Sequence, residues 1–130
     1  KKHLLFSNIN DNDIVYESHQ DTVANITNDM RPLASTIKSN QSFAYKHNVF
    51  GVQFHPEFSW DVTRMLMDIR IKKGVSIDSD KLKESPNSYK VLNNFVDIIK
   101  EKLDLFFQLN ERAQNLSMVY QMIGSSFYLF

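Results

Sequence analysis

The sequence predicts an α/β fold in which short, mostly antiparallel strands precede two amphipathic helices. The first half contains short runs of β-forming residues that turn-forming residues separate. After His55 the period of the apolar residues changes from about two to about 3.6 residues. The chain has 130 residues, 42% hydrophobic and 23% charged, a composition typical of one globular domain with one core.

Five short segments of the first half are expected to form strands. They are residues 4–6, 13–18, 31–38, 42–46 and 49–54. Turn formers such as the stretch SNINDND separate these segments, so short connections should favour antiparallel pairing between neighbours. The run VFGVQF at residues 49–54 is the clearest strand, and its glycine suggests that another part of the chain approaches the backbone closely.

Two helices are expected after His55. The stretch SWDVTRMLMDIRIKKG repeats apolar residues at helical spacing, with Ser59 as N-cap and Gly74 at the end. A second helix should begin near Ser88, and its apolar stripe should pack against the sheet like that of the first. The residues of this second stripe are Leu92, Phe95, Val96, Ile99, Leu103 and Phe106. The final apolar stretch LSMVYQMIGSSFYLF is expected to be a terminal strand or an apolar tail.

The charge and the residue types argue against several classes of function. Fifteen basic and fifteen acidic residues give a formal net charge of zero, which argues against a nucleic-acid or membrane partner. No apolar run is long enough for a transmembrane span or a signal-peptide core, so a cytoplasmic protein is expected. The sequence has neither cysteine nor a glycine-rich phosphate motif, and we expect no cofactor and no metal.

His55 and Glu57 follow the clearest strand directly. On an extended backbone residues i and i+2 point to the same side, and Pro56 disfavours a helical conformation of His55. Glu57 would then hydrogen-bond one ring nitrogen of His55 and raise the basicity of the other nitrogen. The pair therefore suggests the base and the orienting carboxylate of a nucleophile relay, with a chance surface pair as the alternative.

A second polar cluster, in the stretch ESHQD, contains Ser18, His19 and Asp21. A polar turn at the end of a strand is the simplest interpretation of this cluster. Adjacent side chains on a strand point to opposite faces, so Ser18 and His19 do not make a nucleophile pair. A zinc site would require this cluster and the His55–Glu57 pair to converge, and nothing in the sequence indicates that they do.

The stretch GVQFHPEFS, with SHQD some thirty residues earlier, resembles the C-terminal part of a class I glutamine amidotransferase domain. The order of LLFSNI, YESHQDTV, LAST, FAYK, GVQFHPEFS and NSYKVLNNFVDII is similar to that in the amidotransferase domain of GMP synthase. This resemblance covers roughly residues 4–100 and implies the later part of an α/β three-layer sandwich. We therefore expect a partial amidotransferase-like domain at residues 1–109, and an apolar extension of unknown role at residues 110–130.

The resemblance also implies roles for four residues. His55 corresponds to the base of a Cys-His-Glu triad, Glu57 to its orienter, and Ser18 and His19 line the glutamine pocket. The implied reaction is hydrolysis of the glutamine side-chain amide by a cysteine thiolate, with backbone amides as the oxyanion hole. That cysteine lies on a Gly-x-Cys-x-Gly elbow upstream of the matched residues, and this sequence contains neither the elbow nor a cysteine.

We therefore expect a truncated amidotransferase-like protein that has no glutaminase activity alone. Two alternatives remain open. In the first alternative, the chain is one half of a split amidotransferase, and a separate N-terminal chain with the cysteine completes it. The completed protein would bind glutamine and interact with a synthase partner. The other alternative is a non-catalytic interaction module, which the apolar residues 110–130 favour.

Overall fold

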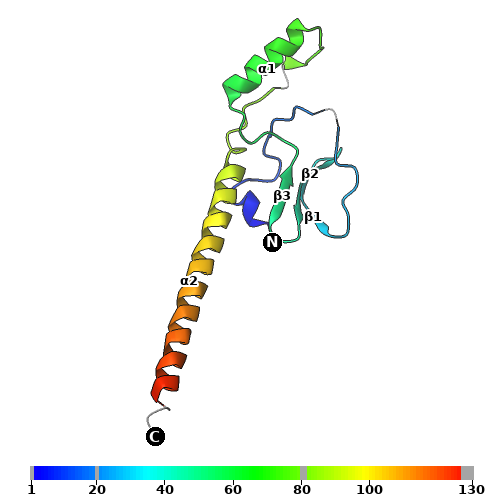
Figure 1. The fold of residues 1–130 in the computed structure, drawn as a ribbon. Helices are drawn as coiled ribbons and strands as arrows, with labels where there is room; N and C mark the ends of the chain where they lie inside the picture. The colour runs from blue at the N-terminus through cyan, green and yellow to red at the C-terminus, as the bar shows by residue number, and fades with distance from the viewer. Residues whose placement is uncertain (1, 20, 80–81, 127–130) are drawn as a thin grey trace. The chain divides into compact units, whose positions relative to one another are not determined.

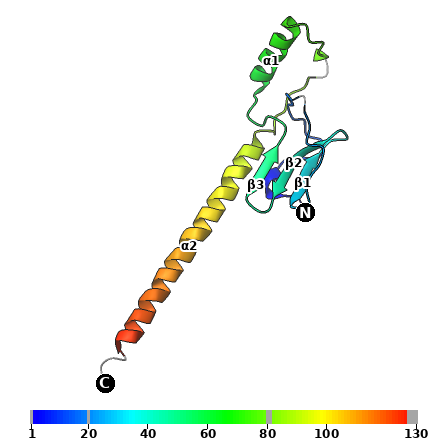
Figure 2. The same cartoon turned by 45° about the vertical axis from the view of Figure 1, so that its right-hand side comes forward.

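The computed structural model of the chain describes residues 2–19, 21–79 and 82–126 (Figure 1, Figure 2). Within these residues one three-stranded antiparallel sheet and two α-helices form, so the α/β prediction is confirmed. The elements are η1 (Leu4–Phe6), β1 (Met30–Ser35), β2 (Asn40–Tyr45), β3 (Val49–Val52), α1 (Trp60–Lys72) and α2 (Lys90–Ser126). The chain divides into two compact units, residues 1–94 and 95–130, and the boundary falls within the second turn of α2.

The sheet has the order β1-β2-β3, with β2 in the centre (Figure 1). β1 is an edge strand, and its register with β2 shifts after Pro32. Proline has no N–H to donate to the ladder and is tolerated at an edge, which accounts for the irregularity there. The turn between β2 and β3 contains Lys46 at a φ of 52°, a left-handed conformation that closes a tight connection.

A small core in the first unit joins the N-terminal segment to the sheet. Its buried apolar residues are Leu5, Phe6, Ile9, Tyr16, Ala44, Phe54 and Val91. The rings of Phe6 and Phe54 lie 6.4 Å apart between centroids, in a tilted arrangement that suits aromatic pairs. Phe54, two residues after the end of β3, is therefore held by the same core that buries the N-terminal segment.

Polar side chains attach the beginning of α2 to the N-terminal segment. Asn94 Nδ2 donates hydrogen bonds to the carbonyl oxygens of Leu5 (3.0 Å) and Ser7 (2.9 Å). Lys90 Nζ donates to the carbonyl oxygen of Asn8 at 3.1 Å. These carbonyl groups belong to a turn-rich segment without a strand partner, so the side chains of α2 satisfy acceptors that a sheet would otherwise satisfy.

Two of the five expected strands are wrong. Residues 4–6 form the 3₁₀ turn η1, because the N–H groups of Phe6 and Ser7 donate to the carbonyl oxygens of His3 (2.9 Å) and Leu4 (3.0 Å) rather than to a neighbouring strand. Residues 13–18 are extended without a ladder, although the N–H of His55 donates to the carbonyl oxygen of Tyr16 at 2.8 Å. Pro56 follows His55 and has no N–H, so a ladder cannot continue along this side. The expected strands at 31–38, 42–46 and 49–54 are confirmed with shifted ends, as β1, β2 and β3.

The first helix is confirmed as α1. Ser59 is its N-cap, and the hydroxyl oxygen accepts a hydrogen bond from the N–H of Val62 at 3.3 Å. Gly74, just beyond the end of the helix, adopts a φ of 82°, as a C-terminal glycine does.

The second helix is also confirmed, but α2 runs well beyond the apolar stripe that predicted it. It continues to Ser126, so the alternative of a terminal strand is wrong, while residues 127–130 lie outside the described residues. The division of the chain between residues 109 and 110 stays a prediction, and α2 runs across it.

The apolar stripes of the helices are more exposed than their amphipathic pattern predicts. Met65 of α1 is 54% exposed, and Phe106 of α2 is 57% exposed. In the described part of the chain, neither helix has the length and apolarity needed to cross a membrane.

Gly51 provides a test of the β2–β3 packing. It lies opposite Phe43, and a Cβ added at Gly51 would lie 2.5 Å from Phe43 Cζ, too close for two carbon atoms. We expect Gly51→Ala to displace this ring and to lower the free energy of unfolding by about 1 to 3 kcal/mol, measured by urea denaturation. In a Phe43→Ala background the same substitution should cost little, and an equal cost in both backgrounds would contradict this packing.

Candidate functional site

The candidate site is built on a turn that directly follows the sheet. Residues 55–58 form a turn closed by a hydrogen bond from the N–H of Phe58 to the carbonyl oxygen of His55 (3.3 Å). Pro56 occupies the second position of this turn, where its fixed φ is favourable. The expected extended backbone is therefore wrong, because it is a turn that brings the side chains of His55 and Glu57 together.

The His55–Glu57 pair has the geometry of a base and its orienting carboxylate. His55 Nδ1 lies 2.8 Å from Glu57 Oε1. An ionised carboxylate only accepts hydrogen bonds, so Nδ1 carries the proton and Nε2 is left as the basic nitrogen. The hydrogen bond from His55 holds the pKa of the Glu57 carboxyl below its usual range.

Phe58 fixes the imidazole from its face. The two rings stack with centroids 4.1 Å apart and planes only 6° from parallel. The in-plane hydrogen bond to Glu57 and the stacked ring of Phe58 together restrict both rotation and tilt of the imidazole. The sequence alone assigned no role to Phe58. The signal that could have placed it beside His55 was the turn expected at Pro56.

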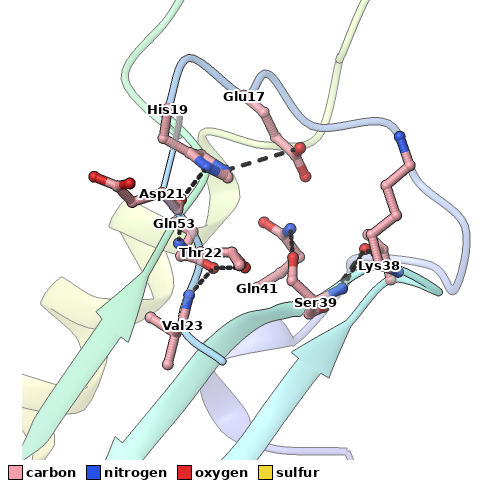
Figure 3. Close-up of polar contacts among 10 residues, drawn as sticks. Glu17, His19, Asp21, Thr22, Val23, Lys38, Ser39, Gln41 and Gln53 are labelled. Carbon is pink, nitrogen blue, oxygen red and sulfur yellow. Dashed lines mark hydrogen bonds and ion pairs between the residues drawn. The ribbon is translucent and has the colours of Figure 1, made fainter. Parts of the chain in front are cut away.

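The two other expected site residues, Ser18 and His19, lie on the segment that the backbone bond between His55 and Tyr16 holds against the end of β3. Ser18 Oγ accepts a hydrogen bond from Arg70 Nη2 of α1 at 2.6 Å. His19 Nδ1 lies 2.7 Å from the carbonyl oxygen of Asp21, and its Nε2 lies 3.8 Å from Glu17 Oε2 (Figure 3). The role of Ser18 and His19 in binding glutamine stays a prediction.

Gln53 holds the segment that follows His19. Its Oε1 accepts hydrogen bonds from the N–H of Val23 (3.2 Å) and the hydroxyl of Thr22 (3.4 Å) (Figure 3). Its Nε2 donates to the carbonyl oxygen of Asp21 at 3.4 Å. Gln53, two residues before His55, thus satisfies three polar groups of the loop at residues 21–23. Nothing in the local sequence pattern distinguishes this side chain from the rest of the expected strand at 49–54.

Two hollows flank this arrangement. A pocket of about 120 Å³ lies between the segment 16–18 and α1, and both Ser18 and Arg70 line it. A larger groove of about 510 Å³ is lined by Glu57 and by aromatic residues that include Trp60. Phe58 lines both hollows, so its ring forms a common wall.

The alternative of a zinc site gains no support from the geometry. His19 contacts the backbone carbonyl of Asp21 rather than a carboxylate that faces His55. Among residues 2–19, 21–79 and 82–126, no group of three or more ligating side chains lies close enough to hold a metal ion.

Comparison with protein families gives a match over more than half of the chain. A family model described as Glutamine amidotransferase class-I matches residues 1–71, which is more than half of the chain. The matched residues contain His55, Glu57, Ser18 and His19 together with the three strands. No curated protein and no solved structure matches the chain significantly.

The pKa of Glu57 generates a prediction about pH. Because this pKa lies below the ordinary value of 4.5 in the folded chain, the contact with His55 stabilises the fold above about pH 4.5. That contribution is lost as the pH falls through the lowered pKa. We expect the titration midpoint of Glu57, followed by carbon NMR of its carboxyl group, to rise towards 4.5 in His55→Ala. The control His47→Ala should leave the midpoint unchanged, and an unchanged midpoint in His55→Ala would show that the hydrogen bond is absent.

The hydrogen bonds of Gln53 generate a second prediction. Gln53→Met keeps the size of the side chain but removes the acceptor of the Val23 N–H. Amide hydrogen exchange at Val23 should accelerate about three- to tenfold, the effect of losing one hydrogen bond of ordinary strength. Gln108→Met, on the exposed part of α2, is the matched control. Equal exchange at Val23 in Gln53→Met and in the unmodified chain would argue against this anchoring.

Proposed function

Since the chain belongs to the class I glutamine amidotransferase family, we propose that it supplies the histidine base and the orienting carboxylate for glutamine amide hydrolysis. The observation that carries this proposal is the 2.8 Å contact between His55 Nδ1 and Glu57 Oε1 at the end of the sheet. The sequence contains no cysteine. The 130 residues therefore have no glutaminase activity by themselves, and the thiolate comes from elsewhere.

In the proposed reaction a thiolate attacks the amide carbon of glutamine, and the C–N bond breaks. His55 Nε2 takes the proton of the thiol as the thiolate forms, and gives it to the departing ammonia. It then takes a proton from the water that hydrolyses the thioester, and returns this proton to the leaving thiolate. Glu57 keeps the proton on Nδ1, so the same nitrogen, Nε2, acts in both steps. Phe58 holds the ring in place while its charge changes, because its stacked face contacts both protonation states.

We further propose that the chain is the later part of an amidotransferase domain of the GMP synthase type. The order of the stretches SHQD, FAYK, GVQFHPEFS and NSYKVLNNFVDII supports this subtype. The partner would be an N-terminal amidotransferase segment with a Gly-x-Cys-x-Gly elbow, and glutamine would bind to the complex of the two. A synthase would then consume the ammonia.

A non-catalytic interaction module is the second candidate. The exposed apolar side chains of α2 favour it, because exposed apolar patches mark interaction surfaces. Among them are Leu103, Leu105, Phe106, Phe107 and Leu109, each about half exposed or more. In this candidate function the His55–Glu57 pair has no chemical role.

An ammonia-release assay separates these functions. The purified chain alone should release no ammonia from L-glutamine, because no thiolate is present. Addition of a purified N-terminal segment with the elbow, encoded immediately upstream, should give ammonia release that falls about a thousandfold or more in His55→Ala. His47→Ala, which removes a histidine from the turn after β2, should keep the activity.

Three outcomes would count against the proposal. Ammonia release by the chain alone that disappears in His55→Ala would show that a thiolate is not needed. A stable complex that releases no ammonia would favour the interaction module. Full activity of the complex with His55→Ala would show that His55 takes no part in the reaction.

A further inference from the structure

The sequence of α2 has the apolar repeat of a helix that packs lengthwise against another helix. In the four heptads that begin at Leu92, the first positions hold Leu, Ile, Phe and Ala, and the fourth positions hold Phe, Lys, Leu and Leu. A repeat of 3.5 residues keeps one apolar seam on the same side of a long helix, and a second helix is the partner that fits such a seam. Lys102 is the one polar residue among these eight positions.

The side chains of this seam are exposed. Between residues 96 and 119, eight apolar side chains in the seam and at the fifth and seventh heptad positions beside it are each 41–59% exposed, and Phe106 and Leu116 are the most exposed of them. A half-exposed side chain of this size keeps roughly 75 to 100 Å² of accessible surface. One helix therefore offers about 600 to 800 Å², within the range of about 600 to 1,000 Å² that each partner buries in a stable interface.

The length of α2 limits what can cover the seam. With 37 residues and a rise of about 1.5 Å for each, α2 is about 55 Å long, whereas a small domain is about 30 Å across. A globular partner of that size would cover only part of the seam. A second copy of α2 has the same length and the same repeat, so it can cover the seam from end to end.

The charges of α2 argue against a lipid surface as the alternative occupant. A helix that lies on a membrane is rich in Lys and Arg on its polar face. Residues 96–119 instead contain four acidic and three basic side chains. Asp97, Asp104 and Glu111 occupy the sixth heptad position, on the side of the helix opposite the seam. These carboxylates would face solvent in a helix pair, and they do not attract anionic lipid.

We propose that two copies of the chain associate through the seam of α2, with the two helices antiparallel. In a parallel pair identical positions face each other, so Lys102 would lie opposite Lys102 of the second copy, and the like charges would repel. The inference does not rest on the proposed function, because it uses no residue of the His55–Glu57 turn.

An antiparallel pair removes this repulsion. First heptad positions then face fourth positions of the second copy, and the opposing pairs are Ile99 with Leu116, Phe106 with Leu109, and Lys102 with Ala113. The small side chain of Ala113 leaves room for the aliphatic stem of Lys102, whose ammonium group extends to solvent. The other two pairs bring large apolar side chains together along the seam.

A cysteine cross-linking experiment tests the arrangement, since the chain has no cysteine of its own. Ile99→Cys and Leu116→Cys variants of the full chain are mixed and mildly oxidised, and the products are identified by mass spectrometry of their peptides. The mixed disulfide should exceed either homodisulfide at least about tenfold, because the two sulfur atoms meet only across the antiparallel pair. Gln108→Cys, on the polar face of α2, mixed with Leu116→Cys is the matched control and should give little disulfide.

Light scattering gives the number of copies. The unmodified chain should have twice the mass of one copy. Leu109→Glu should be monomeric, because it places a carboxylate in the middle of the seam, whereas Gln108→Glu adds the same charge on the polar face and should remain dimeric. Circular dichroism shows whether each variant keeps its helices, and if Leu109→Glu loses them the cross-linking result decides.

Three outcomes would overturn the inference. The first is a monomeric unmodified chain over the whole soluble concentration range. The second is a homodisulfide of each single-cysteine variant in place of the mixed disulfide, which would indicate parallel helices. The third is a folded Leu109→Glu variant that remains dimeric, which would locate the contact between copies outside the seam.

Discussion

A backbone hydrogen bond of 2.8 Å, from the N–H of His55 to the carbonyl oxygen of Tyr16, joins the two parts of the candidate site. β3 ends at Val52, and the proline at position 56 cannot donate to a further ladder bond. Tyr16 is only 5% exposed, and its hydroxyl accepts a hydrogen bond from the N–H of Ser85 at 2.8 Å. The position of Ser18 and His19 relative to the end of the sheet therefore depends on how firmly the core holds Tyr16.

The parts of the fold that depend on neighbours in sequence were predictable. β1, β2 and β3 are joined by short turns, and Ser59 caps α1 through its own first turn. The segment 13–18 was not predictable in the same way, because its residues favour β structure while a strand also requires a ladder partner. The length of α2 was missed for the opposite reason. Its last part is rich in apolar residues that suit a strand or a helix, and the period there is ambiguous.

The candidate site shows the same difference between contacts that are local in sequence and contacts that are not. Residue types and spacing identified His55 and Glu57, although a turn rather than an extended backbone brings them together. Their chemistry could be derived because two residues of one turn are always close. The contact of Arg70 with Ser18 spans 52 positions, and that of Gln53 with Val23 spans 30. Such pairs follow from tertiary packing, which neither propensity nor periodicity encodes.

The turn at residues 55–58 has a consequence for the order in which the site assembles. Its donor, its acceptor and the stacked ring all lie within four consecutive positions, so the His55–Glu57 pair forms at almost no cost in loop closure. The contacts that place Ser18 close much longer loops and can form only after the chain has collapsed. The His55–Glu57 turn is therefore an early, local structure, whereas the contact between Ser18 and Arg70 forms late and is the first to be lost when the domain is destabilised. Evolution could preserve or transplant the turn as a unit, while the pocket beside it requires the whole domain.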